Sequence, residues 1–118
     1  MLIKDLDCLE NILESIEKIE LYSAQLKSAD NLLKDSKSFD AILMNFIIVG
    51  EMVAKLSEEF KSEYTEIEWW KIKGFRNIVA HNYFGIDAEE VWQIIQNKLP
   101  QLKSFIQKSL KKTEYGNH

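Results

Sequence analysis

The chain is almost free of residues that interrupt helices, and this feature constrains its fold more than any other. Its 118 residues include one proline and four glycines. Proline inside a helix removes a backbone hydrogen bond and clashes with the preceding turn, and glycine costs about 1 kcal/mol relative to alanine. Because these two residues are so sparse, long segments can run as uninterrupted helix, and the sequence favours an all-α fold.

The spacing of apolar side chains supports the same fold class. From Leu2 to Leu26 they recur at intervals of three and four residues, which places them on one face of a long helix. The same spacing runs from Phe39 to Leu56, and a third helix is predicted at roughly Glu66–Ala80. Between the first two, Lys27–Ser38 is rich in polar turn formers and is predicted to be a loop.

A fourth helix is predicted to begin after Asp87, whose side chain can cap it, with Glu90 three residues later completing a capping box. Pro100 then ends or kinks this helix, or begins a new one. The expected fold is an up-and-down bundle of four to five helices, with one domain at residues 1–112 and a flexible tail at 113–118.

The charge of the chain bears on whether it binds nucleic acid along its whole surface. A net charge of −4 argues against a protein that coats nucleic acid, since such binding draws on neutralised phosphates. Five lysines without an acid lie between Lys98 and Lys112, and we interpret them as a solvated helix face rather than an RNA track. The three tryptophans suit the core or a dimer interface better than a base-stacking platform, and they are predicted to lie in the core.

The sequence also indicates the cellular environment. The single cysteine, Cys8, cannot pair within the chain and is predicted to be a buried apolar residue, as expected in the reducing cytoplasm. The longest apolar run, "FIIVG", is too short to cross a membrane, and "MLIKDLDCLE" carries charges that a signal peptide would lack.

Polar chemistry is concentrated in "RNIVAHNYFG", which holds Arg76, Asn77 and His81. An arginine fork fits phosphate oxygens, and a histidine transfers protons near neutral pH. With the amide of Asn77 as a neutral donor, these groups suit cleavage of an RNA phosphodiester. The RNA supplies its own nucleophile, the 2′-hydroxyl, so no metal or other cofactor is required. The alternative is structural: a histidine that favours a helix C-terminus and an arginine that packs along an apolar face.

The spacing of these residues limits how they can meet. Arg76 and His81 are five residues apart and would point about 140° away from each other on an unbroken helix. Either the helix ends near Ala80 and the chain bends back, or two copies of the chain contribute to one site. A twofold dimer would present both residues twice.

The segment "GFRNIVAHNYFGIDAEEVWQIIQNKLPQLK" resembles the HepT-like branch of the HEPN proteins, which are small bacterial and archaeal helical domains. The motif that carries the resemblance is Arg-x4-His-x-Tyr, filled by Arg76, His81 and Tyr83. "FIIVGEMVAKLSEEF" resembles the second helix of the family, with Gly50 and Glu51 as its recognisable pair.

This resemblance implies a homodimeric, metal-independent ribonuclease that acts as the toxin beside a minimal nucleotidyltransferase antitoxin. The partner would use ATP to transfer AMP to Tyr83 and so silence the nuclease. The opposite assignment, a non-catalytic partner of the nucleotidyltransferase, is also implied. Glu51 would either orient Arg76 through a charged hydrogen bond or lie at the helix edge in water.

Overall fold

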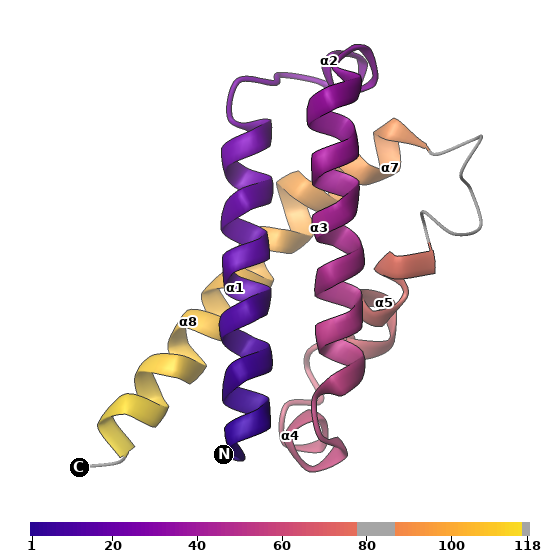
Figure 1. The fold of residues 1–118 in the computed structure, drawn as a ribbon. Coiled ribbons are helices and arrows are strands. Elements are labelled where there is room, and N and C mark those ends of the chain that lie inside the picture. The colour runs from indigo at the N-terminus through magenta and orange to yellow at the C-terminus, as the bar shows by residue number, and fades with distance from the viewer. Residues whose placement is uncertain (78–86, 117–118) are drawn as a thin grey trace.

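The structure is a computed structural model that describes residues 1–77 and 87–116. Side chains are described only up to residue 112. Two long helices, α1 (Ile3–Ser23) and α3 (Ser36–Lys55), lie antiparallel and pack along each other (Figure 1). Their facing residues form the centre of the core, where Leu9, Ile16 and Phe46 are fully buried. The amphipathic spacing of both segments therefore predicted the main packing interface correctly.

The segment between these helices differs from the prediction. Lys27–Ser38 was expected to be a loop, but it contains the short helix α2 (Ala29–Lys34) and the start of α3. Ser28 caps α2 by accepting a hydrogen bond from Asn31 N–H, and Leu32 is fully buried. Serine and asparagine were interpreted as turn formers, whereas here the serine starts a helix.

The chain then turns through α4 (Glu58–Glu63) into α5 (Trp69–Lys73), which packs against α3. The third helix, predicted at Glu66–Ala80, begins later than expected, at Trp69. Gly74 forms a turn, residues 75–77 are helical again, and residues 78–80 lie outside the described part of the chain. An aromatic cluster anchors this region on the C-terminal helix through Phe60, Tyr64, Trp69 and Phe105. Trp69 also donates its indole N–H to the Tyr64 carbonyl oxygen, at 3.0 Å.

The last part of the chain is one helical run made of α7 (Ala88–Gln93), η1 (Ile94–Lys98) and α8 (Leu99–Gly116). Asp87 caps it as predicted, accepting hydrogen bonds from Glu89 N–H and Glu90 N–H. The η1 segment is a π-helical turn in which Leu99 N–H bonds to the Ile94 carbonyl, five residues back. Pro100, which lacks an N–H, follows this turn and lies in the first turn of α8.

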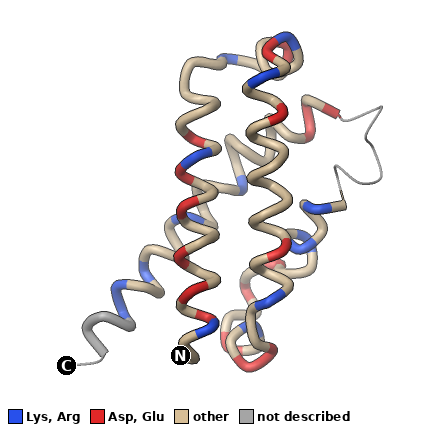
Figure 2. The backbone as a smooth tube through the Cα atoms, viewed as in Figure 1, with Lys and Arg blue, Asp and Glu red and all other residues tan. Residues whose placement is uncertain are grey.

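The α8 helix crosses α1 and leads away from it toward the C-terminus (Figure 1). Figure 2 shows the lysines along α8 and the mostly acidic charges of α1. Lys103 on α8 binds Glu20 on α1 at 2.7 Å, and this hydrogen bond raises the pKa of the lysine. The backbone of α8 is helical as far as Gly116, into the segment predicted as a tail.

The described residues contain helices and turns but no strand, which confirms the all-α bundle. None of the described helices has the length and apolar character needed to span a membrane. Cys8 is buried against the core as predicted, and burial raises the pKa of its thiol.

Candidate functional site

The structure places Glu51 against Arg76. The guanidinium Nη1 of Arg76 donates to Oε1 of Glu51 at 3.2 Å, joining α3 to the segment that follows α5. Both side chains keep solvent contact, with 34% of Arg76 and 45% of Glu51 exposed. A pair this exposed contributes at most about 1 kcal/mol to stability, so its main effect is to orient the arginine.

The contact leaves much of the guanidinium outside the pair. Arginine carries five N–H donors in a planar fork, and Glu51 engages it through Nη1. Nε and Nη2 take no part in this ion pair. The geometry therefore suits a side chain that is held from one side and presents donors to an oxyanion on another.

Gly50 lets the Arg76 segment approach α3 closely. A Cβ atom at Gly50 would lie 3.0 Å from both the Arg76 nitrogen and the Lys73 carbonyl oxygen, which is tighter than nine in ten Cβ contacts in proteins. The neighbouring Phe75 is buried and stacks on Phe46 of α3, with ring centroids 5.2 Å apart. A missing side chain and a buried aromatic pair thus fix the backbone from which Arg76 extends.

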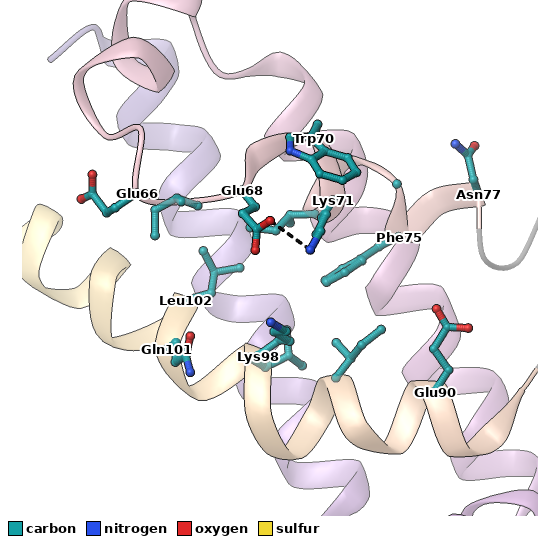
Figure 3. A pocket seen from close by; sticks show the side chains of 15 residues that line it. Glu66, Glu68, Trp70, Lys71, Phe75, Asn77, Glu90, Lys98, Gln101 and Leu102 are labelled. Atoms are coloured by element: carbon teal, nitrogen blue, oxygen red, sulfur yellow. Dashed lines mark ion pairs between the residues drawn. The ribbon is translucent and has the colours of Figure 1, made fainter.

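Asn77 is exposed and lines a cleft of about 640 Å³. We call it the Trp70 cleft; Trp70, Phe75 and Asn77 line one side, and Ile94, Lys98 and Leu102 line the other (Figure 3). The π-helical turn supplies part of its far wall, because Ile94 and Lys98 are the first and last residues of η1.

His81 and Tyr83, the other two residues of the motif, lie outside the described residues. The structure therefore brings together Glu51 and Arg76, with Asn77 next in the chain, and leaves the positions of His81 and Tyr83 as predictions. Among the side chains that the structure describes, in residues 1–77 and 87–112, no cluster of histidine, cysteine, aspartate or glutamate could hold a metal ion.

One residue of this region was interpreted wrongly from the sequence. The tryptophans were expected in the core, and Trp69 is buried while Trp92 packs against the core. Trp70, in contrast, is 71% exposed. Successive helical residues point about 100° apart, so two adjacent tryptophans on a short helix that packs on one side need not both face the core.

The described helices and the oriented arginine define a small all-α protein with an ion-paired arginine near a cleft. The chain belongs to the family described as Ribonuclease HepT-like, whose model matches residues 12–109. This match confirms the resemblance seen in the Arg-x4-His-x-Tyr motif.

The names of similar proteins are consistent with membership of this family. A Methanocaldococcus jannaschii protein named "Gamma-glutamylcyclotransferase and putative RNase" is 33% identical over 106 residues, 90% of this chain; the match spans about half of that longer protein, 47% of its length. "Probable ribonuclease HepT" of Thermococcus cleftensis is 32% identical over 86% of this chain and 92% of its own. A "Putative RNase" of Caldanaerobacter subterraneus is 29% identical over 88% and 92%, respectively. No solved structure gives a significant match.

Proposed function

We propose that this protein is a metal-independent endoribonuclease, the toxin of a pair with a minimal nucleotidyltransferase antitoxin in the cytoplasm. The observation that carries the proposal is the Arg76 guanidinium, held by Glu51 at the first position of the Arg-x4-His-x-Tyr motif. Membership of the Ribonuclease HepT-like family and the names of the relatives support the substrate class.

The proposed reaction uses the 2′-hydroxyl of RNA as the nucleophile. Its oxygen attacks the adjacent phosphorus, the bond from phosphorus to the 5′-oxygen breaks, and a 2′,3′-cyclic phosphate results. A base accepts the 2′-hydroxyl proton, and an acid gives a proton to the leaving 5′-oxygen. We assign His81 as the acid or the base in these transfers. Arg76 stabilises the charge that develops on the phosphoryl oxygens, and Asn77 adds a neutral donor.

We further propose that two copies of the chain form the active unit. Met44 is 58% exposed on α3 and lies seven residues, or about two turns, before Glu51, so both are on one face of the helix. Ile47 and Ile48 are half-buried on the same side. This apolar strip leads to the Arg76–Glu51 pair, and a twofold contact along it would bring two copies of the motif toward one cleft.

The test is RNA cleavage by wild type, Arg76→Lys and His81→Ala, with and without EDTA. Lysine keeps the charge but not the fork, so Arg76→Lys should lose most activity while circular dichroism stays unchanged. His81→Ala should lose roughly two to four orders of magnitude in rate, and EDTA should have no effect on wild type. Undiminished cleavage by Arg76→Lys would make the arginine a structural or general cationic contact.

Regulation is tested with the nucleotidyltransferase partner and ATP. AMP on Tyr83 would add negative charge and bulk two residues from His81, so modification should abolish cleavage. Tyr83→Phe should retain nuclease activity and escape silencing. If wild type and His81→Ala are equally inactive on every RNA while Tyr83 is still modified, the protein is instead the non-catalytic partner of the nucleotidyltransferase.

A further inference from the structure

Trp70 exposes a large aromatic surface at a cleft from which the proposed cleavage chemistry uses only Asn77. Its side chain is 71% exposed, whereas its neighbour Trp69 is 9% exposed within the aromatic cluster. Lys71 places its ammonium 5.3 Å from the Trp70 ring centroid, a cation–π contact that restrains the ring. An exposed indole beside an apolar hollow has the features of a binding surface.

The charges of the Trp70 cleft indicate what can enter it. Glu66, Glu68 and Glu90 contribute carboxylates, and Lys71 and Lys98 contribute ammonium groups. Glu68 is held by Lys71 at 2.9 Å, and this hydrogen bond lowers the pKa of its carboxyl, so it stays ionised. With three carboxylates against two ammonium groups, the cleft disfavours a phosphate group and suits a neutral group that donates hydrogen bonds.

The apolar walls suit a group with flat faces. Phe75 and Leu102 line the cleft near the indole (Figure 3), and Ile94 is a further apolar lining residue. Its volume of about 640 Å³ lies within the range of small-molecule sites, roughly 300 to 1,000 Å³.

The cleft lies next to the segment that carries Arg76. Phe75 and Asn77, the residues on either side of Arg76 in the chain, both line the cleft, although Arg76 itself does not. In a nucleic acid strand each phosphate carries a base to its side. A phosphate at Arg76 can therefore place a neighbouring base in the cleft.

We propose that the Trp70 cleft binds one nucleobase of single-stranded RNA, stacked on the indole of Trp70. The inference deepens the proposed nuclease function and rests on it for the identity of the strand. Sequence-tolerant stacking on aromatic side chains is a common way to hold unpaired bases. The phosphates of the strand stay outside the Trp70 cleft, on the side of Arg76.

The test measures binding of a labelled 2′-O-methyl RNA oligonucleotide, which lacks the nucleophile and cannot be cut. Trp70→Ala should weaken binding by between about five- and a hundred-fold, the range that one lost base stack gives. Trp70→Phe keeps an aromatic face and should restore most of the affinity. Leu21→Ala is the matched control, because Leu21 is also 71% exposed but lies on α1; its binding should equal that of wild type.

A second strand separates stacking from other effects. A fully abasic oligonucleotide of the same length keeps the phosphates but offers no base, so wild type and Trp70→Ala should bind it equally. Equal binding of the base-containing strand by wild type and Trp70→Ala would overturn the proposal. So would a Trp70→Ala defect of the same size on the abasic strand, since that defect would not depend on a base.

Cleavage of unmodified RNA, measured in parallel, distinguishes the two proposals. If wild type cuts RNA, and Trp70→Ala binds and cuts it as well as wild type does, the proposed base-binding site is refuted and the proposed nuclease activity is retained. If wild type cuts nothing but the Trp70 and abasic results hold, the nuclease fails and the base site stands. If Trp70→Ala changes only self-association in sedimentation, the indole is a protein contact and the base site is refuted.

Discussion

Replacing Gly50 with alanine tests whether close backbone packing positions Arg76. The new methyl group would lie 3.0 Å from the Lys73 carbonyl oxygen and from the Arg76 nitrogen, and 3.3 Å from Arg76 Cβ. Two of these three atoms belong to the backbone, so no side-chain rotation can relieve the contact. Either α3 or the segment carrying Arg76 must shift.

Two opposing contributions set the expected change in stability. Alanine is favoured over glycine inside a helix by about 1 kcal/mol. Overpacking a well-packed site costs about 1 to 3 kcal/mol, and rigid backbone neighbours place Gly50 in the upper half of that range. The net loss should therefore be about 1 to 2 kcal/mol, which lowers Tm by roughly 4 to 8 °C in a domain of this size.

The assay is thermal unfolding followed by circular dichroism at one fixed protein concentration, because self-association makes Tm depend on concentration. Ala54→Gly on the same helix is the control, since Ala54 is half-buried on α3 and reports the helix propensity change in the opposite direction. If Gly50→Ala raises Tm by the amount that propensity alone predicts, the close approach is not a constraint and the argument for Arg76 positioning is refuted.

Two further substitutions test other contacts. Asp5 is 2% exposed and accepts hydrogen bonds from Ser57 N–H at 2.7 Å and from the Ser57 hydroxyl at 2.6 Å. Asp5→Ala should therefore lower the free energy of unfolding, measured in urea, by about 2 to 3 kcal/mol. Asp7 is exposed, so the control Asp7→Ala should change it by less than about 0.5 kcal/mol. Met44→Asp puts a charge on the apolar strip proposed as the dimer contact. In sedimentation the variant should have the mass of one chain, where wild type has twice that mass, and its helicity should be unchanged. A wild type that is monomeric and still cleaves RNA would contradict an active site shared between two copies.

The long helices could be predicted because their core faces repeat over many turns. Along α1 and α3 every third or fourth residue is apolar, and the same residues fill the core. The cap at Asp87 was predictable for a local reason, because its carboxylate needs only the two backbone N–H groups that follow. Such signals depend on the chain within one or two turns.

The site was harder to predict because it depends on contacts between distant segments. The pairing of Glu51 with Arg76 spans 25 residues and depends on the turn at Gly74, which no periodic pattern reveals. The role of Gly50 is equally invisible in the sequence, since glycine in a helix usually only weakens it. Which of Trp69 and Trp70 faces the core was decided by the Phe60–Phe105 cluster.

The π-helical turn acts as a register adjustment between the two halves of the last helix. Buried residues Val91, Ile95 and Leu99 are spaced by four, and in an ideal α-helix each such step drifts by about 40°. The wider turn at Ile94–Lys98 takes up this drift, and Leu102 and Ile106 continue on the core side. If the same residues adopted ordinary α geometry here, everything after the turn would be rotated by about 100°, and the apolar side chains of α8 would leave the contact with α1. The geometry of the backbone through this turn, rather than any single side chain, thus decides which side of α8 faces water.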